Sequence, residues 1–261
     1  MSALRTSFSL SSAFCLALSS AAWSAEPKSL NAGGSHAGPA VPTAATRKPY
    51  DLIFTPIVPC RAFYSPSAVA ANSTANYQIT GTGSFVPQGG PAGGCGVPVS
   101  AKAVAINLSA VSASSAGYFR ANATGAATPP TTVLTYRAAV NETGAATVAL
   151  GTAGGLSVYS AGKTRIVGDV TGYYAPQIHA VLAPTGGIYD GSERVLSSTR
   201  LSQGSYRVQI DRDPAGCTPI PTVNGSAYFA SAYVSGGYIY ANTYTPGGAA
   251  ADVYWALAVF C

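Results

Sequence analysis

The stretch Lys102–Ser112 reads KAVAINLSAVS, and it carries an apolar residue at every second position. Alternate side chains of a β-strand point to opposite faces, whereas an amphipathic helix repeats its apolar positions every 3.6 residues. The period of two therefore predicts a strand with one buried face. The residues expected on that face are Val104, Ile106, Leu108 and Ala110.

Further short runs of β-branched or aromatic residues follow this stretch, and turns rich in Gly, Ala, Ser and Asn separate them. Short strands at this spacing are typical of all-β proteins, so we expect two antiparallel β-sandwich or barrel-like domains. No helix longer than two turns is predicted. The other expected strands are Thr132–Arg137, Ala145–Leu150, Leu156–Tyr159, Arg165–Val170, Ser205–Ile210, Ala227–Val234, Tyr238–Tyr244 and Val253–Phe260.

The composition excludes several classes of protein. Charged residues make up 9% of the 261 residues, against about 25% in an average globular chain, which excludes a coiled coil or a helical array. The 14 basic and 9 acidic residues give a net charge of +5, but no cluster of Lys and Arg forms a basic stripe. We therefore expect no nucleic-acid partner.

The N-terminus has the three parts of a secretory signal peptide, which we expect over residues 1–25. Arg5 is the positive charge, Leu10–Leu18 the apolar stretch and Ser20–Ala22 a small-residue cleavage site, with cleavage after Ala25 as the alternative. The apolar stretch is shorter than the roughly 20 residues of a membrane-spanning helix, and no later segment qualifies. The sequence thus predicts a secreted protein, extracellular or on the cell surface, without a membrane span.

Composition also divides the rest of the chain. Residues 26–48 are rich in Gly, Pro, Ala and Ser. Such a segment cannot bury enough apolar surface to offset its ordering entropy, so we interpret it as a disordered spacer. A second boundary falls near Ala175–Gln177, where one β-rich run ends and another begins. The predicted domains therefore span 49–176 and 177–261.

Four cysteines remain once the leader is removed together with Cys15, and an even number in an exported chain indicates disulfides. Three pairings are possible; the sequential one, Cys60–Cys95 with Cys217–Cys261, is favoured because each domain then has its own crosslink. Closing loops of about 36 and 45 residues would stabilise the fold by roughly 4 kcal/mol each. A zinc site is not favoured, because the chain has no Cys-x-x-Cys motif.

The first domain resembles a family of secreted bacterial β-modules, of unestablished activity, that open on a TPCR motif. Five stretches occur in the family's order and cover roughly residues 54–174. The resemblance implies an extracellular β-rich module and no reaction. After Arg61 the family continues with an acidic–basic pair that this chain lacks, so no role of that pair is carried over. The matching stretches are Phe54–Arg61, Cys95–Pro98, Ala103–Leu108, Gly117–Phe119 and Gly168–Tyr174.

The second domain is similar to a C-terminal module of secreted and cell-surface bacterial proteins, over about residues 186–261. In that module a cysteine soon after Asp-Arg-Asp and another at the last position imply a bridge to the final strand. This resemblance also implies an extracellular β-rich module without implying a reaction. The matching stretches are Gly204–Val208, Asp211–Asp213, Gly216–Cys217 and Ala256–Cys261.

Residues for bond-breaking chemistry are few. Nucleophilic catalysis needs a Ser or Cys beside a His base, but His36 lies in the predicted spacer and His179 at the domain junction. Asp211 and Asp213 are weak candidates for acid–base chemistry or for calcium. Pro214 follows them directly, which favours a role in a turn or cap. We expect no enzyme activity, no cofactor and no metal site.

Aromatic residues crowd the C-terminal end of the chain. Tyr238 and Tyr240 are two residues apart and Tyr244 follows after four more, so all three should share one face of a sheet. One interpretation is that such rings supply core volume in a domain rich in Ala and Gly; the other is that they form a surface platform. On the second interpretation these three tyrosines are the candidate ligand-binding residues, and the low charge of the chain suits a neutral glycan.

The leading prediction is a secreted, non-enzymatic protein of the bacterial cell surface or matrix that acts in adhesion or binding, with a glycan as the candidate partner. The alternative is a structural subunit of an extracellular fibre or surface layer, whose partner is another copy of itself, because edge strands without charge pair readily. A hydrolase acting on polymers is a third interpretation. Its carboxylates would be Asp169, Asp211 and Asp213, although we expect Asp169 to be a buried structural acid.

Overall fold

The computed structural model describes residues 51–224 and 227–261, and they fold almost entirely into β-strands. Sixteen strands, β1 to β16, form four antiparallel sheets of four strands each, which confirms the predicted all-β class. The one helical element in this part of the chain is the 3₁₀ turn η2 (Val86–Gln88). Among the described residues, then, no helix could cross a membrane. The predicted signal peptide (1–25) and spacer (26–48) lie outside the described residues.

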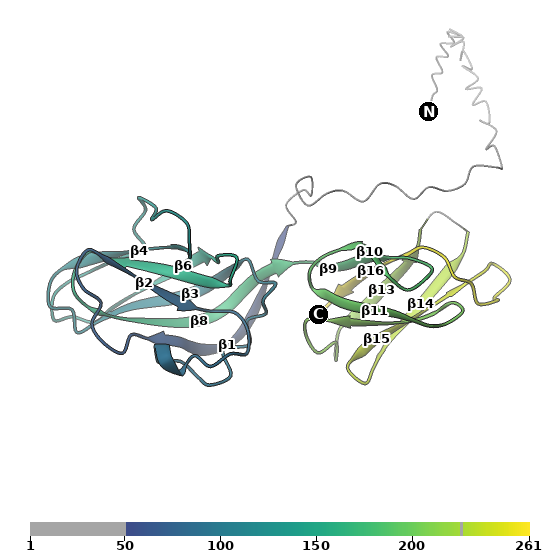
Figure 1. Ribbon diagram of the computed structural model, residues 1–261, viewed down its shortest axis with the longest axis horizontal. Helices are drawn as coiled ribbons and strands as arrows, with labels where there is room; N and C mark the ends of the chain where they lie inside the picture. The colour runs from purple at the N-terminus through teal and green to yellow at the C-terminus, as the bar shows by residue number, and fades with distance from the viewer. Residues whose placement is uncertain (1–50, 225–226) are drawn as a thin grey trace, which may run out of the picture. The chain divides into compact units, whose positions relative to one another are not determined.

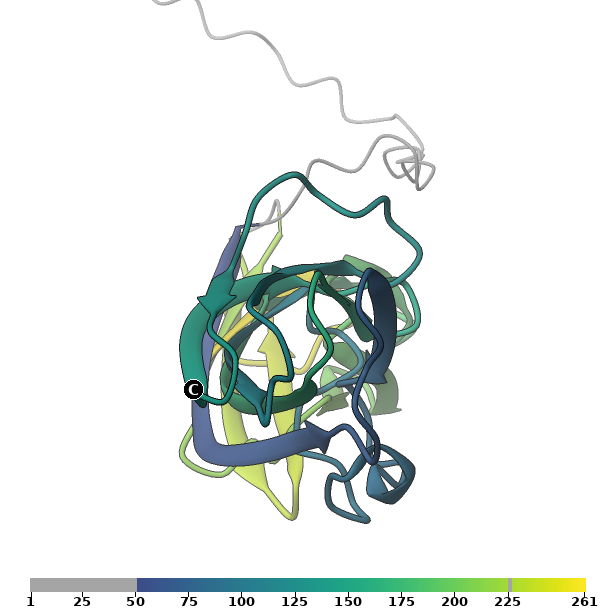
Figure 2. The same cartoon turned by 90° about the vertical axis from the view of Figure 1, so that its left-hand side faces the viewer.

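Strands β1 to β8 form two sheets around one hydrophobic interior (Figures 1 and 2). The first sheet has the strand order β1 (Leu52–Tyr64), β8 (Arg165–Pro176), β3 (Ala103–Val111) and β6 (Glu142–Ala149). The second sheet has the order β2 (Ser73–Gln78), β7 (Gly155–Ser160), β4 (Gly117–Ala123) and β5 (Leu134–Tyr136).

The central strand β3 confirms the pattern of the KAVAINLSAVS stretch. Its alternate residues face the interior and are at most 1% exposed, while the residues between them are half-buried. Neighbouring strands on both sides satisfy its backbone, with β8 on one edge and β6 on the other. The buried residues are the four predicted ones, Val104, Ile106, Leu108 and Ala110.

Two glycines of β8 allow aromatic rings of β1 to lie directly on the strand. A Cβ on Gly168 would be 2.1 Å from the ring of Phe63. A Cβ on Gly172 would be 2.3 Å from the ring of Phe54. Neither contact is possible, because non-bonded carbons pack at about 3.5–4.0 Å. Phe63 is fully buried and stacks on Tyr77 of β2, with ring centroids 3.7 Å apart, so Gly168 helps to join the two sheets.

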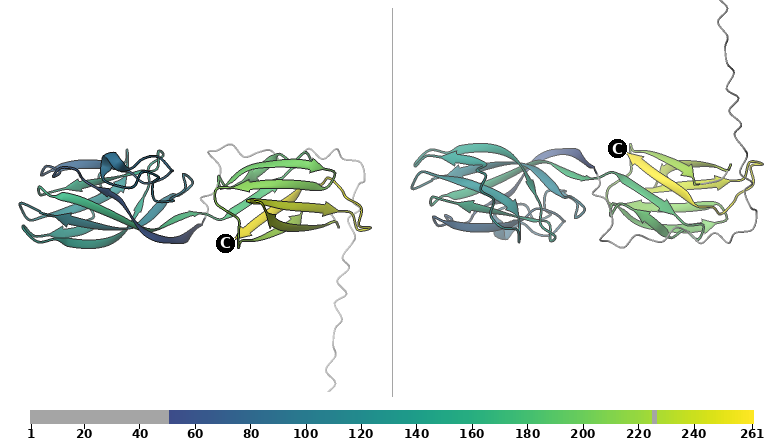
Figure 3. Two further views of the ribbon diagram at one scale, coloured as in Figure 1. Left: turned by 90° about the horizontal axis from the view of Figure 1, so that it is seen from below. Right: turned by 90° about the horizontal axis from the view of Figure 1, so that it is seen from above.

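Strands β9 to β16 form the other two sheets, seen as two layers of strands in Figure 3. Their interior contains Trp255 and Tyr206, whose ring centroids are 5.3 Å apart. One sheet has the order β10 (Ile188–Gly191), β9 (Ile178–Leu182), β16 (Trp255–Phe260) and β13 (Thr218–Val223). The other has the order β11 (Val195–Ser202), β12 (Ser205–Ile210), β15 (Tyr238–Tyr244) and β14 (Phe229–Ser235).

The described part of the chain contains two disulfides, and they have the sequential pairing that the sequence favoured. Cys60 of β1 is bonded to Cys95, with the Cα atoms 5.7 Å apart. Cys217, directly before β13, is bonded to Cys261 after β16, with the Cα atoms 4.1 Å apart. Each bridge therefore ties a strand end or a long loop back to a sheet.

The change from one pair of sheets to the other falls at the predicted boundary. Strand β8 ends at Pro176 and β9 begins at Ile178. The buried hydrophobic residues divide at the same place, since one cluster extends to Ala175 and the other begins at Ile178. The division into two domains, 49–176 and 177–261, remains a prediction.

Several observed strands were not predicted, and β13 is the most instructive. Its sequence TPIPTV contains Pro219 and Pro221, which cannot donate backbone hydrogen bonds. The strand lies at the edge of its sheet and pairs only with β16. On its other side there is no neighbouring strand, so the missing N–H groups of the prolines remove no backbone hydrogen bonds there. The remaining strands that were not predicted are β1, β2, β4, β9, β10 and β11.

Candidate binding surface

The sheet β11-β12-β15-β14 has one buried face and one outer face, and strand β15 shows the division most clearly. Ile239, Ala241 and Thr243 point inward and are fully buried. The alternate residues, which include Tyr238, Tyr240 and Tyr244, lie on the opposite face and are half-buried. The structure therefore brings the three predicted tyrosines to one outer surface of the sheet, and the buried core of this region uses other aromatic residues.

Strand β14 extends this surface with two more rings. Tyr233 lies opposite Tyr240, and their ring centroids are 5.3 Å apart with planes at 11°. Phe229 lies opposite Tyr244, with centroids 5.0 Å apart and planes at 23°. Tyr233 and Phe229 are 52% and 49% exposed, so one side of each pair is open to solvent. Cross-strand aromatic pairs of this kind stabilise a sheet while keeping their outer edges accessible.

A third aromatic contact completes the surface on β12. The Arg207 guanidinium carbon lies 4.7 Å from the centre of the Tyr238 ring, a cation–π contact. Between the two stacked pairs the surface is polar, because Ser231 pairs with Asn242. We define the aromatic face as Phe229, Tyr233, Tyr238, Tyr240 and Tyr244, with Arg207, Ser231 and Asn242 between and beside the rings.

The aromatic face carries very little charge. Among the four strands of its sheet, the charged residues are Arg200 and Arg207. The Arg200 guanidinium donates two hydrogen bonds to the carboxylate of Asp252, at 2.9 and 2.7 Å. That carboxylate also accepts the Gly204 backbone N–H at 2.8 Å. Hydrogen bonds from Arg200 and then from Gly204 lower the pKa of Asp252 from 3.8 to about 2, so this ion pair fixes the β11–β12 hairpin at neutral pH.

The chemistry that this surface can perform is non-covalent. Flat rings with phenolic hydroxyls can stack on the apolar face of a sugar ring and form hydrogen bonds at its edge. The Asn242 amide and the Ser231 hydroxyl lie between the stacked pairs and add donors and acceptors. Stacking of this type supplies a large contact area at a small cost in side-chain entropy.

The carboxylates considered as metal ligands or acid–base groups lie elsewhere and have separate partners. The Asp211 side chain is 6% exposed; it accepts a hydrogen bond from Arg194 Nε at 3.0 Å and one from the Ser100 hydroxyl at 2.6 Å. Asp213 accepts the Ala215 backbone N–H at 3.0 Å, which is the turn role expected from the sequence. No group of His, Cys, Asp and Glu side chains in the described part of the chain could hold a metal ion.

Asp169 and the two histidines were the other residues weighed for catalysis. Asp169 was expected to be a buried, hydrogen-bonded acid. It accepts two hydrogen bonds from Arg61, at 2.9 and 3.2 Å, but the expected burial was wrong, because its side chain is 30% exposed. His179 has its Nδ1 3.0 Å from the Gln177 carbonyl oxygen. His36 lies outside the described residues. The aromatic face is therefore the strongest candidate for a functional surface.

The sequence reasoning counted Phe229 and Tyr233 among the aromatic residues of this region but did not place them, or Arg207, on the face of the three tyrosines. A signal for the two β14 residues was present. Gly236 and Gly237 both have positive φ, 56° and 79°, and form the two-residue turn between β14 and β15. A two-residue turn with two glycines fixes the register of a hairpin. Counting outward from it places Tyr233 opposite Tyr240 and Phe229 opposite Tyr244.

Comparison with known proteins adds no further assignment. No family model, no curated protein and no solved structure matches this chain. The two resemblances stated from sequence motifs therefore stay expectations.

Proposed function

We propose that this protein is a secreted, non-enzymatic binding protein of the bacterial cell surface or matrix, and that its aromatic face binds a neutral polymer, in the first instance a glycan. One observation carries the proposal: five aromatic rings lie on the outer face of one sheet, and those of Phe229 and Tyr233 are about half exposed. Buried hydrophobic area stabilises a fold, so rings kept at the surface favour a contact with something outside the chain.

The low charge of the surface supports a neutral partner. Binding an anionic polymer would need several cations on the aromatic face, and Arg207 is the one basic residue of that face. A neutral polysaccharide needs no charged groups, and its hydroxyls match the Tyr, Ser and Asn side chains of the face. The cation–π contact of Arg207 also holds the Tyr238 ring in place before a ligand arrives, which lowers the ordering cost of binding.

The test is a binding assay of the purified whole chain on a glycan array, followed by pull-down with insoluble cellulose, chitin and xylan. We expect at least one neutral polysaccharide to bind, and Tyr240→Ala combined with Tyr233→Ala to weaken that binding at least about tenfold. Stacking of a nucleic-acid base on such a ring is worth about 1–3 kcal/mol, and we take the lower end of that range for a sugar.

The control for this experiment is a second aromatic pair in the other half of the chain. Tyr118 and Tyr159 have ring centroids 6.1 Å apart and also contact an arginine, Arg120. Tyr118→Ala should leave binding unchanged. Absence of binding to every polysaccharide, or equal losses in the test and control variants, would contradict the proposal.

A second candidate function, a subunit of a fibre or surface layer, is favoured by the edge strand β14. Its sequence FASAYVS has no charge and no proline, and it pairs with β15 on one side alone. Natural edge strands usually carry charged residues or proline, which block pairing with other chains. Electron microscopy and light scattering of the concentrated protein test this function: filaments that disappear in Ser231→Lys would support it, and monodisperse monomers at high concentration would contradict it.

A further inference from the structure

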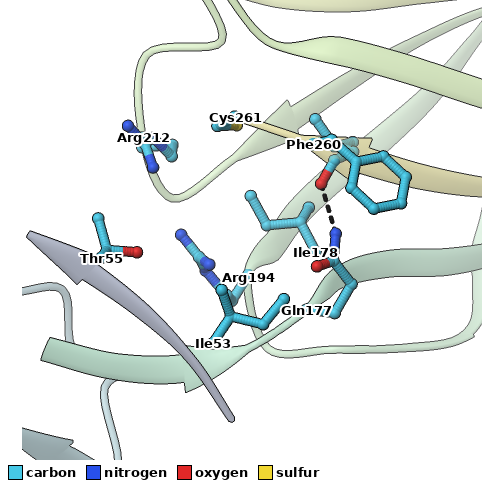
Figure 4. Close-up of a pocket in the computed structure, with 9 residues that line it drawn as sticks. Ile53, Thr55, Gln177, Ile178, Arg194, Arg212, Phe260 and Cys261 are labelled. Atoms are coloured by element: carbon cyan, nitrogen blue, oxygen red, sulfur yellow. Dashed lines mark hydrogen bonds between the residues drawn. The ribbon is translucent and has the colours of Figure 1, made fainter. Parts of the chain in front are cut away.

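The cavities that lie apart from the aromatic face differ in the groups that they offer a ligand. One, of about 120 Å³, is lined in part by Thr55, Arg194 and Arg212 (Figure 4). The Arg194 side chain is only 5% exposed, and its one nitrogen without a hydrogen-bond partner in residues 51–224 and 227–261, Nη2, is buried as well. That donor is out of a ligand's reach, so we assign no ligand to this cavity.

A second cavity, of about 340 Å³, is a trough on the outer face of the sheet β1-β8-β3-β6. One row of paired residues crosses all four strands beneath it. Tyr64 of β1 lies opposite Val167 of β8, which lies opposite Ser109 of β3. Ser109 in turn lies opposite Thr143 of β6. Val167 is 5% exposed but stands outside the core cluster, so it forms the floor of the trough. Sites for small molecules have about 300–1,000 Å³, so one small ligand fits here.

Two pairs of polar side chains at the trough hold each other in place. Arg61 Nε and Nη2 donate to the two carboxylate oxygens of Asp169, at 2.9 and 3.2 Å. The third nitrogen, Nη1, forms no hydrogen bond within the described ranges, and the Arg61 side chain is 57% exposed, so a ligand can reach it. The Ser109 and Thr143 hydroxyls are 2.6 Å apart, so one donates to the other and the second keeps its hydrogen for a ligand.

Tyr64 and Asn141 complete the polar lining from opposite edges of the sheet. The Tyr64 hydroxyl accepts a hydrogen bond from Arg165 Nη1 at 3.4 Å, and the Arg165 guanidinium carbon lies 5.4 Å from the centre of the Tyr64 ring. Asn141 Oδ1 accepts the Ser112 backbone N–H at 3.1 Å. Both side chains act as acceptors toward the protein, which leaves the Tyr64 O–H and the Asn141 Nδ2 as donors toward the trough.

The charge around the trough is positive. Arg61 is balanced by Asp169, but Arg165 has no carboxylate partner among the residues that the structure describes. The one other charged residue on the four strands of this sheet is Glu142, which pairs with Arg137. A lining of donors beside an unbalanced cation favours a ligand that is rich in acceptors and negatively charged.

We propose that the trough binds an acidic sugar, a uronic acid unit of a polysaccharide. Its carboxylate accepts hydrogen bonds from Arg61 Nη1, its hydroxyls accept from Tyr64 and from the Ser109–Thr143 pair, and its apolar face lies on Val167. A small anion would leave most of the volume empty, and a neutral sugar would leave Arg165 unbalanced; an acidic sugar satisfies both. The trough and the aromatic face lie on different sheets and take ligands of different charge, so this inference does not rest on the proposed function.

The experiment is calorimetric titration of the whole protein with oligomers of galacturonate, guluronate and mannuronate, each compared with the same oligomer after methyl esterification. Esterification removes the charge and keeps the sugar rings. We expect saturable binding of at least one acidic oligomer, and at least about tenfold weaker binding of its ester, the loss expected for one charge-assisted hydrogen bond. Absence of saturable binding for all the acidic oligomers, or equal binding of acid and ester, would overturn the proposal.

Variants locate the ligand. Arg61→Gln should weaken binding by about tenfold, and Thr143→Val should weaken it by less, because a hydroxyl donates a neutral hydrogen bond. Arg200→Gln is the matched control: Arg200 also donates two hydrogen bonds to one carboxylate, that of Asp252, but lies on another sheet. Both arginine variants therefore lose one positive charge and one ion pair of the same kind. Equal losses of binding in the two would mean that the ligand is not in the trough.

The aromatic-face variant separates this proposal from the proposed function. Tyr233→Ala combined with Tyr240→Ala should bind the acidic oligomer as tightly as the wild type does, whether or not a neutral glycan binds to the aromatic face. Loss of the acidic oligomer in that double variant would assign the ligand to the aromatic face and overturn the trough as its site.

Discussion

The stacked pair Phe63–Tyr77 and the stacked pair Tyr233–Tyr240 are similar in geometry and opposite in surroundings. The first has centroids 3.7 Å apart and planes at 6°, and both rings are at most 5% exposed. The second has centroids 5.3 Å apart and planes at 11°, and Tyr233 is 52% exposed. Burial also raises the pKa of the Tyr77 phenol to about 12. The comparison teaches that stacking alone does not identify a functional surface; exposure decides whether rings serve the core or a partner.

The largest expected effect comes from removing the buried ring. Phe63→Ala deletes a fully buried side chain that contacts both Tyr77 and Gly168. We expect the free energy of unfolding to fall by about 3–5 kcal/mol, through lost burial and the cavity that remains. Guanidinium unfolding followed by far-UV circular dichroism measures this. A fall in the free energy of unfolding of less than about 1 kcal/mol would show that the Phe63–Tyr77 stack contributes little to the stability of the core.

A smaller effect is expected from Gly168→Ala, which adds one methyl group beneath the same ring. Its Cβ would lie 2.1 Å from Phe63, so the ring or the strand must shift, at about 1–3 kcal/mol. Gly83→Ala is the matched control, because nothing lies within 4 Å of its Cβ. The double variant Gly168→Ala with Phe63→Ala should lose less than the sum of the single losses. Strict additivity would contradict the direct contact.

The exposed stack should contribute much less to stability than the buried one. Tyr233→Ala removes a half-exposed cross-strand partner, so we expect the free energy of unfolding to fall by about 0.2–1 kcal/mol. The main effect of Tyr233→Ala should instead be weaker glycan binding, because the Tyr233–Tyr240 stack is expected to supply contact area for the ligand. If Tyr233→Ala proved as destabilising as Phe63→Ala in the same unfolding experiment, the exposed rings would be structural, and the aromatic face would lose its main support.

Much of the fold could be predicted from local patterns, because both β3 and β15 show the period of two in their own residues. Strand β15 matches its predicted bounds Tyr238–Tyr244, and its parity places three tyrosines on one face. Strand β11 (VLSSTRLS) has no such pattern. Most of its residues are exposed, so neither of its faces needs a run of apolar side chains. Its pairing with β12 is what makes it a strand, and that pairing is not visible in its composition.

The candidate sites could be predicted to different degrees for the same physical reason. The aromatic face is built from neighbouring strands joined by the Gly236–Gly237 turn, so its register is local information. By contrast, a cavity lined by Thr55, Arg194 and Arg212 depends on residues from distant parts of the chain. Nor does the sequence reveal that Arg194 is buried, or that its Nη2 has no hydrogen-bond partner within residues 51–224 and 227–261. Such a site becomes visible once the sheets have been assembled.

The smallest expected effect concerns the ion pair that anchors the sheet of the exposed stack. The pKa of Asp252 is lowered from 3.8 to about 2 in the folded protein, so its ionised form is favoured by folding. Its contribution is complete above about pH 4 and is lost as the pH falls toward 2. Because the pair is partly exposed, we expect Asp252→Asn to cost about 0.2–1 kcal/mol near neutral pH.

The measurement is urea unfolding of wild type and Asp252→Asn at about pH 6, 4 and 2.5. The difference between the two proteins should be similar at the first two values and should shrink at the last, where Asp252 approaches its folded pKa of about 2. Raising the salt concentration should also reduce it, because exposed charges are screened. A difference that stayed constant down to the lowest pH would mean that Asp252 acts through its shape and hydrogen bonds, and that charge has no part in holding the sheet beneath the exposed rings.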